Sequence, residues 1–303
     1  MIGAGPSALS AAIYTTREDI ETVLYEKAIV GGLAAITDKV DNYPGFADGV
    51  EGMKLADELQ RQAERFGAKI EYGDVTALRD EGDYRVVTVD GSDVKARTVL
   101  IATGSDYSKL GISGEAEYYG RGVHYCATCD GAFYRDKRLV VVGGGNSGVQ
   151  EALFLTRFAT HIDLLVRSTL KASEVLQRDL QEYIDNGKVT VHLQTTPEEI
   201  VADESGKVTS VRAIKAGEPA IFETDGVFVF IGLKPNTQFL AGSGVELDER
   251  GLIKTDEHME TNVPGVFASG DVRSGATMQV ASAVGEGATA ALSIREFLDA
   301  QHR

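Results

Sequence analysis

Short apolar runs alternate along the chain with segments of helical periodicity. The runs 22–25, 98–102, 138–142, 162–166 and 226–231 are rich in Val, Ile, Leu and Phe and carry few charges. Such runs predict strands that are buried on both faces of a parallel sheet. The sequence therefore predicts an α/β fold built on parallel sheets.

Helices are predicted between these strands. In the segment 53–66, apolar residues recur at intervals of three and four, which places them on one face of a helix. Further helices are predicted at 9–16, 149–158, 177–183 and 281–298. Short strands at 69–72, 74–78, 84–89 and 93–95 predict a β-meander beside the parallel sheet.

The second half of the chain continues in the same way. Strands are predicted at 189–192, 208–214 and 220–223, with 251–255 and 265–271 closing the sheet. A turn is predicted at 234–236, which reads Lys-Pro-Asn.

A glycine-rich turn stands at the start of the chain. Gly3, Gly5 and Ala8 form the pattern G-x-G-x-x-A, with Pro6 and Ser7 inside it, and a predicted helix follows. This turn lets the backbone approach a pyrophosphate, which the helix N-terminus then binds. The motif predicts a dinucleotide site.

The surroundings of this turn both support and complicate that prediction. Glu26, at the end of the next strand, is placed to accept hydrogen bonds from ribose hydroxyls. However, only Met1 and Ile2 precede the turn, where a buried strand of about five residues should lie. We therefore expect the numbered chain to start inside its first strand, either because residues are missing before Met1 or because the true start lies upstream.

A second glycine-rich turn follows about 140 residues later. Gly143, Gly145 and Gly148 form the full pattern G-x-G-x-x-G, with Asn146 and Ser147 inside it, between a predicted strand and a predicted helix. A match in this context is more specific than the glycines alone. The chain therefore carries two predicted dinucleotide sites.

The two sites differ in charge. The position that corresponds to Glu26 is Arg167 in the second copy, and Lys171 lies four residues further on. A carboxylate repels a 2′-phosphate, whereas a guanidinium binds it. The sequence predicts a nucleotide without a 2′-phosphate at the first site and NADP(H) at the second. A surface salt bridge is the alternative interpretation of Arg167.

Both cysteines of the chain lie together, at Cys126 and Cys129. A disulfide between them closes a very small ring and adds little stability, so its use is redox chemistry. Half of a zinc site and a chance pairing are the alternatives. Zinc needs two more Cys or His ligands, and His124 is the only His close in sequence; no metal is expected.

The composition of the chain disfavours some classes of binding partner. The formal net charge is −16, so the chain lacks the Lys and Arg excess that binds nucleic acid. No apolar run approaches the length of a membrane span, and no signal peptide precedes the first turn. A single vicinal cysteine pair favours a cytoplasmic protein.

In the order and spacing of its motifs the whole chain resembles the low-molecular-weight thioredoxin reductases, flavoproteins with two dinucleotide-binding domains. The motifs that carry the resemblance lie at 3–8, 41–46, 102–104, 126–134, 143–148, 230–237 and 264–271. The resemblance implies two Rossmann-like domains, the second inserted within the first. It places an FAD-binding domain at 1–108 and 239–303, and an NAD(P)H-binding domain with the cysteine pair at 109–238. It also implies a homodimer.

The resemblance also implies roles for residues. Gly3, Gly5, Pro6, Ser7 and Ala8 would hold the FAD pyrophosphate and Glu26 its ribose. The remaining FAD contacts would come from Asn42, Thr103, Gly104, Asp271, Gln279 and Val280, the last two at the isoalloxazine edge. The second turn, with Arg167 and Lys171, would bind NADPH.

At the cysteines, the resemblance implies that Cys129 faces the flavin and that Cys126 attacks the disulfide of a partner such as thioredoxin. Asp130 would be the acid–base group, because a thiolate must form and a leaving thiolate must be protonated. A helix N-cap is the alternative role for Asp130, and His124 is the alternative base.

Three positions depart from the family pattern. Ser168 replaces one Arg of the 2′-phosphate site, Leu33 replaces a Gln near the flavin, and Met278 replaces an Arg before Gln279. These changes keep open a second function on the same FAD and dithiol core, either a ferredoxin-linked reductase or a dithiol oxidase. A flavin-bound redox sensor without turnover is a third hypothesis.

Overall fold

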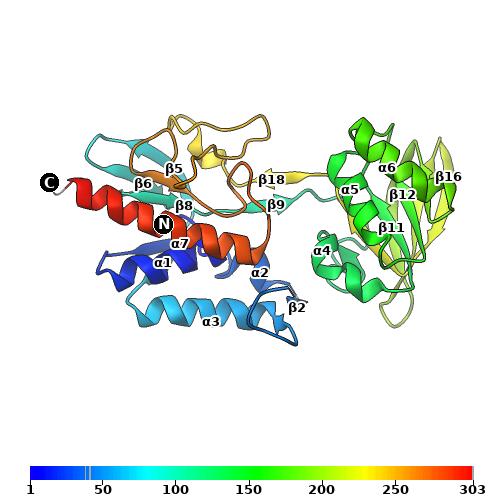
Figure 1. Cartoon of the computed structure of the whole chain (residues 1–303), viewed down its shortest axis with the longest axis horizontal. Coiled ribbons are helices and arrows are strands. Elements are labelled where there is room, and N and C mark those ends of the chain that lie inside the picture. Colours follow the sequence, from blue (N-terminus) through cyan, green and yellow to red (C-terminus); the bar gives the residue numbers. More distant parts are fainter. Residues whose placement is uncertain (38, 41, 302–303) are drawn as a thin grey trace. The chain divides into compact units, whose positions relative to one another are not determined.

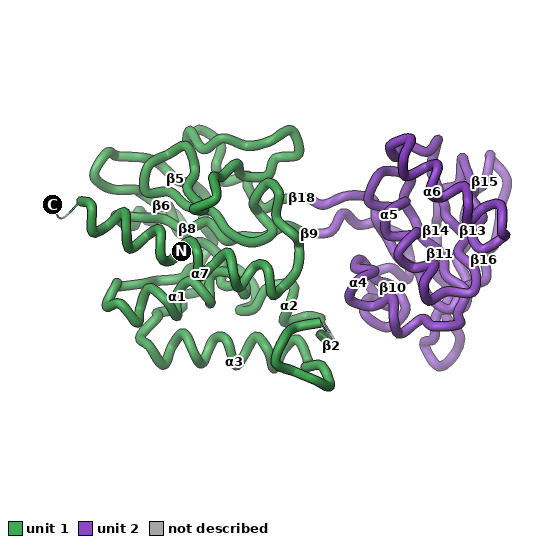
Figure 2. Tube along the Cα trace, in the orientation of Figure 1, with its two compact units in different colours: residues 1–106, 234–303 green, residues 107–233 purple. Residues whose placement is uncertain are grey.

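The computed structural model describes residues 1–37, 39–40 and 42–301. Asp41, the first residue of the loop motif 41–46, lies outside them. The chain divides into two compact units, 1–106 with 234–303 and 107–233 (Figure 2). The family resemblance placed the domain boundaries after residues 108 and 238. The chain passes between the units through β9 (Ser105–Tyr107) and β18 (Leu233–Pro235), which pair with each other.

The first unit is built on a parallel sheet. Its paired strands are β4 (Lys69–Tyr72) with β1 (Val23–Glu26), and β8 (Val99–Ile101) with β19 (Val266–Ala268). Ile2 joins the two pairs, since it forms parallel bridges with Tyr25 of β1 and Ile101 of β8. The segment before the first glycine turn therefore fills the central strand position.

Alternate residues of this sheet face two different layers. Leu100 and Phe267 pack with the helices α1 (Pro6–Arg17), α3 (Gly52–Arg65) and α7 (Val280–Gln301). Ile101 and Ala268 point to the other face, where the antiparallel meander lies (Figure 1). The meander consists of β5 (Val75–Asp80), β6 (Arg85–Val89) and β7 (Ser92–Ala96). This three-layer arrangement is the predicted one.

The second unit repeats the scheme. Its parallel sheet has the strand order β10 (Val123–His124), β17 (Gly226–Val229), β11 (Arg138–Val142), β12 (His161–Leu165) and β13 (Val189–His192). Val141 and Leu164 pack with α5 (Asn146–Leu155) and α6 (Glu174–Asp185). Val140 and Leu165 face the opposite layer. That layer is the antiparallel sheet of β14 (Thr195–Ala202), β15 (Val208–Lys215) and β16 (Glu218–Glu223).

Three local predictions are wrong or incomplete. No strand forms at 251–255, where Ile253 makes only isolated bridges with Leu247 and Arg273. The predicted turn at 234–236 is mostly strand β18. Strand β14 was not predicted; it contains Pro197 and a bulge beside it, which break the alternation. Further short elements of the first unit are α2 (Gly32–Ala35), β2 (Lys39–Val40), β3 (Val50–Glu51) and η2 (Gln238–Leu240).

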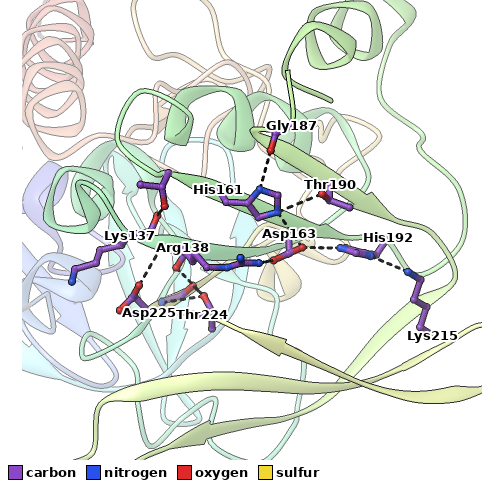
Figure 3. Close-up of polar contacts among 12 residues, drawn as sticks. Lys137, Arg138, His161, Asp163, Gly187, Thr190, His192, Lys215, Thr224 and Asp225 are labelled. Carbon is purple, nitrogen blue, oxygen red and sulfur yellow. Dashed lines mark hydrogen bonds and ion pairs between the residues drawn. The ribbon is translucent and has the colours of Figure 1, made fainter. Parts of the chain in front are cut away.

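A polar cluster surrounds the buried carboxylate of Asp163 in the second sheet (Figure 3). The carboxylate of Asp163 accepts from Arg138 Nη2 at 3.0 Å and lies 2.8 Å from His192 Nε2 and 3.4 Å from His161 Nε2. Lys215 Nζ reaches the other ring nitrogen of His192 at 3.1 Å. Because Asp163 is buried while Arg138 is half exposed, loss of this charge-assisted hydrogen bond would cost about 1.5–3 kcal/mol. The cluster therefore stabilises the unit.

Within the described part of the chain, no helix is both long and apolar enough to cross a membrane.

Candidate active site

The cysteine pair lies directly after β10, in the second unit. Cys126 is the N-cap of the short helix α4 (Ala127–Asp130), and its sulfur forms a disulfide with Cys129. The backbone amide of Cys129 donates to Cys126 Sγ at 3.1 Å. An amide donor stabilises negative charge on the sulfur it contacts. The Cys126 sulfur thus has a backbone hydrogen-bond donor in this structure.

Asp130 follows Cys129 at the end of α4. Its Oδ2 lies 3.0 Å from Nδ1 of His124, and its side chain is about one-fifth exposed. The N-cap interpretation of Asp130 is wrong, because the carboxylate makes no capping hydrogen bond to η1 (Gly131–Tyr134). The carboxylate is therefore available for chemistry beside the cysteines.

His124 is buried behind Asp130. Its Nε2 lies 2.7 Å from the hydroxyl of Tyr134, so both ring nitrogens have partners. Burial, followed by the charges of Asp130 and Asp225, raises the pKa of Tyr134. Tyr134 therefore keeps its proton, and its hydroxyl remains a partner of Nε2. Spacing alone did not link Tyr134 to this site; it lies ten residues from His124.

The first glycine turn has the backbone that a phosphate site requires. Gly3 has φ +93°, and a Cβ there would lie 2.6 Å from the carbonyl oxygen of Ala102. Gly5 is the N-cap of α1, which begins at Pro6. Ser7 is fixed by a 2.5 Å hydrogen bond to Ser269, and Ala8 is fully buried. The free amides at the start of α1 can therefore face an anion.

Glu26 closes one side of this site. Its two carboxylate oxygens accept from the amides of Ala4 and Ala28, each at 2.8 Å. Beside it is a cavity of about 360 Å³, lined also by Gly3, Thr103 and Asn236. That volume is within the range of ligand sites. The arrangement fits the adenosine end of a dinucleotide.

The other predicted contacts of the first site lie in the same unit. Asn42 Nδ2 donates to Oε1 of Gln279 at 2.9 Å, and Val280 begins α7. Thr103, which precedes Gly104, donates from Oγ1 to the carbonyl of Asn236 at 2.7 Å, and Asn236 Nδ2 donates back to the Thr103 carbonyl at 3.1 Å. Asn236 was predicted only as part of a turn.

Asp271 stands in an acidic environment. Burial, and then the charge of Glu286, raises the pKa of Asp271 to about 6. Glu286 itself is held by Arg273 at 2.7 Å and accepts from the amide of Gly270 at 2.8 Å. Sequence reasoning missed Glu286, because nothing in the helical pattern of α7 indicates that this acid faces the site.

The second glycine turn closes in the same manner. Gly143 has φ +144°, and a Cβ there would lie 2.3 Å from the carbonyl oxygen of Phe230. Gly148 has equally little room, because a Cβ there would lie 2.3 Å from the carbonyl oxygen of Gly143. Gly145 is the N-cap of α5, where Asn146 and Ser147 are exposed. This turn also presents free helix amides to solvent.

A loop after β12 lies against that turn. The amide of Lys171 donates to the carbonyl of Gly144 at 2.7 Å, and the amide of Ser173 donates to Oδ1 of Asn146 at 2.8 Å. Arg167 and Lys171 are exposed. Neither forms an ion pair with another residue that the structure describes, which disfavours the salt-bridge interpretation of Arg167. Both cations are thus available to a phosphate.

Comparison with known proteins gives a consistent picture. Residues 1–287 match the model of the pyridine nucleotide-disulphide oxidoreductase family. The chain is 42% identical over 302 residues to a thioredoxin reductase of Bacillus subtilis, covering 99% of this chain and 94% of that protein. A thioredoxin reductase of Listeria innocua is also 42% identical over 302 residues, covering 99% and 93%. The crystal structure of thioredoxin reductase from Streptococcus pyogenes aligns with a TM-score of 0.92 at 37% identity, covering 99% and 97%.

Proposed function

The chain belongs to the pyridine nucleotide-disulphide oxidoreductase family, and we propose that it reduces the disulfide of thioredoxin with electrons from NADPH. The observation that carries this proposal is the Cys126–Cys129 disulfide, which shares its unit with a glycine-rich nucleotide turn. Family membership implies a flavin and a pyridine nucleotide. A bound flavin would supply the redox chemistry that links hydride from the nicotinamide to reduction of the disulfide.

We assign FAD to the first unit. Gly3, Gly5, Pro6, Ser7 and Ala8 would hold its pyrophosphate, since the turn offers close backbone approach and free helix amides. Glu26 and the adjacent cavity would take the adenosine end. The other proposed contacts are Asn42, Thr103, Gly104, Asp271, Gln279 and Val280.

We assign NADPH to the second unit. Gly143, Gly145, Asn146, Ser147 and Gly148 would bind its pyrophosphate. Arg167 and Lys171, both exposed beside the turn, would bind the 2′-phosphate.

The two cysteines would have different roles. Cys129 would receive electrons from the flavin. Cys126, whose sulfur accepts the Cys129 amide, would attack the partner's disulfide as the thiolate. Asp130 would take the proton of the attacking thiol and return it to the leaving thiolate.

One observation supports a second candidate. Ser168 leaves Arg167 and Lys171 as the basic residues in the loop 166–173, so the 2′-phosphate would have one fewer guanidinium. This favours a relative with the same FAD and dithiol core but another electron donor or direction, such as a ferredoxin-linked reductase or a dithiol oxidase.

Anaerobic flavin bleaching distinguishes the candidates. We expect NADPH to bleach the flavin of the purified protein rapidly and NADH to bleach it more slowly, because Arg167 and Lys171 favour the 2′-phosphate. Slow bleaching by both nucleotides would reject the NADPH-dependent function and support the second candidate.

Serine variants test the cysteines. Cys126→Ser and Cys129→Ser should each abolish thioredoxin reduction, because the dithiol can no longer form, while NADPH still bleaches the flavin. Thioredoxin turnover by either variant would show that electrons leave by another route.

We further propose a homodimer in the reducing cytoplasm, where a vicinal dithiol stays reduced between turnovers. Analytical ultracentrifugation of the holoprotein tests the dimer.

A further inference from the structure

We infer that His124 is a positioning residue for the thiol–disulfide step: it orients the Asp130 carboxylate and links it to Tyr134 in a three-residue hydrogen-bond relay. The inference rests on the proposed function of the dithiol and deepens it. His124 was considered above only as an alternative base. The structure assigns it a different role, because its two ring nitrogens contact Asp130 and Tyr134 and not a cysteine sulfur.

The geometry sets the order of the relay. His124 Nδ1 lies 3.0 Å from Asp130 Oδ2, and His124 Nε2 lies 2.7 Å from the Tyr134 hydroxyl. An ionised carboxylate only accepts, so Nδ1 carries a hydrogen and donates to Asp130. In the neutral ring Nε2 then accepts, and the protonated hydroxyl of Tyr134 donates to it. The chain of donors runs from Tyr134 through His124 to Asp130.

The surroundings hold this ring in one orientation. The phenyl ring of Phe228 in β17 stacks on the imidazole with centroids 5.1 Å apart, and Tyr134 meets it edge-on at 5.2 Å. The titratable groups that face the relay are Asp130, Tyr134, Asp225, whose charge acts on Tyr134, and Tyr119, whose pKa is raised by burial and then by Asp130. Cations lie beside the outer two of these groups: Lys109 Nζ is 5.0 Å from the ring centroid of Tyr119, and Lys207 Nζ pairs with Asp225 at 3.2 Å.

A comparison within the unit shows what distinguishes this His–Asp contact from the others. The other buried His–Asp contacts surround Asp163, which also accepts from the permanent cation Arg138 (Figure 3). Asp130 has no Arg or Lys ion pair among the residues described. The hydrogen on His124 Nδ1 is therefore a neutral donor to Asp130, and it is the contact that variants of His124 remove.

The chemistry uses the pair in both directions. Asp130 takes the thiol proton of Cys126, and the thiolate attacks the substrate disulfide, forming one S–S bond and breaking another. The substrate thiolate that leaves takes the proton from Asp130. The thiol proton of Cys129 is released through the same carboxylate, and its thiolate attacks Cys126, freeing the second substrate thiolate, which is protonated in turn. Two electrons and two protons pass from the dithiol to the substrate.

The test isolates this step from the nucleotides. The holoprotein is reduced with dithionite and mixed with a chromogenic aromatic disulfide across a pH series. His124→Ala removes the donor to Asp130. His124→Asn keeps an N–H near the position of Nδ1 but cannot titrate. His161→Asn is the matched control, because the ring of His161 also contacts a buried carboxylate. His161 lies in β12, which is three strands from β10 in the sheet. That separation is about 14 Å.

We expect His124→Ala to slow the exchange by about ten- to a hundredfold, a part of the 10²–10⁴ that acid–base catalysis supplies. The midpoint of the acid limb of its pH–rate profile should move to higher pH, because a donated hydrogen bond favours the charged carboxylate. His124→Asn should recover most of the rate near neutral pH. His161→Asn should match the wild type in both.

Three results would overturn the inference: a wild-type pH profile in His124→Ala, an equal loss in His161→Asn, or no recovery in His124→Asn. Thioredoxin enters as a separate substrate. If the wild type reduces the aromatic disulfide but not thioredoxin, the proposed partner is wrong, and the comparison of His124 variants still decides the inference.

Discussion

The two glycine-rich turns share a backbone conformation, but the residues that follow the next strand differ in charge. At both turns the first glycine adopts a positive φ and lies against a carbonyl, of Ala102 in the first unit and Phe230 in the second. Beyond the next strand the first unit has Glu26, buried and bound to two amides, whereas the second has Arg167, exposed and without an ion pair to the described residues.

This difference separates two functions of a dinucleotide fold. The backbone of the turn provides a pyrophosphate site at either place. The side chain after the second strand selects the nucleotide, because its charge attracts or repels a 2′-phosphate. Asp271 and Glu286 extend the acidic character of the first site. Each turn should therefore be separable by mutation from the other.

The largest effect is expected from filling the first glycine of each turn. Gly3→Ala and Gly143→Ala each combine a left-handed backbone with an overlap onto a carbonyl, at 2.6 and 2.3 Å. Together these cost about 3–5 kcal/mol. Gly3→Ala should purify without bound flavin. Gly143→Ala should keep its flavin, but NADPH should bleach it at least about a hundredfold more slowly.

Gly187→Ala controls for backbone strain alone, because its φ is also positive but no atom lies within 4 Å of the position that the new methyl group would occupy. It should lose about 1 kcal/mol of stability and keep both nucleotides. If Gly143→Ala released the flavin or Gly3→Ala retained it, the assignment of the turns would be reversed.

A smaller effect is expected at Arg167. Arg167→Ala should raise KM for NADPH about ten- to a hundredfold, since a charge-assisted hydrogen bond contributes about 1.5–3 kcal/mol. KM for NADH should not change. Ser168→Arg should act in the opposite direction. The readout is the rate of flavin reduction over a series of nucleotide concentrations.

Arg178→Ala, an exposed arginine of α6 in the same unit, is the control for net charge. Equal losses for NADPH and NADH in Arg167→Ala would mean that this residue supports the loop and does not read the 2′-phosphate.

The sequence predicted the elements whose periodicity is strong. The amphipathic segment 53–66 forms α3 at Gly52–Arg65, and the apolar run 138–142 forms β11 with the same limits. The predictions failed where pairing with distant residues determines whether a segment forms a strand. Lys234 and Pro235 lie in a strand because β9 offers an edge on which the missing N–H of proline is tolerated. Residues 251–255 have a strand-like pattern but no neighbouring strand.

The site was predictable at the level of motifs and not of contacts. Cys126, Cys129 and both glycine turns are visible in the sequence, because tight spacing carries their chemistry. The contact of His124 with Asp130 and Tyr134 depends on the way α4 and η1 fold back on β10. Glu286 approaches Asp271 only through the packing of α7. Tertiary proximity of this kind leaves no pattern in a single sequence.

The smallest effect tests the acidic character of the first site without any nucleotide. Burial and Glu286 raise the pKa of Asp271 from 3.8 to about 6. The folded state therefore holds this proton more tightly than the unfolded state. The resulting stability is present below about pH 4 and is lost as the pH rises through about 6. For a fully buried carboxyl group, this difference in pKa would correspond to about 3 kcal/mol of stability. Because Asp271 is partly exposed, we expect about 1–2 kcal/mol.

Asp271→Asn should remove that loss. In flavin-free protein, the urea midpoint of the variant should rise relative to the wild type between pH 4 and pH 7, by an amount equivalent to about 1–2 kcal/mol. The exposed Asp83→Asn, in the same unit, should show no such change. A difference between Asp271→Asn and wild type that stays constant across this range would show that the first site does not penalise a second negative charge. The contrast with the basic second site would then rest on Glu26 alone.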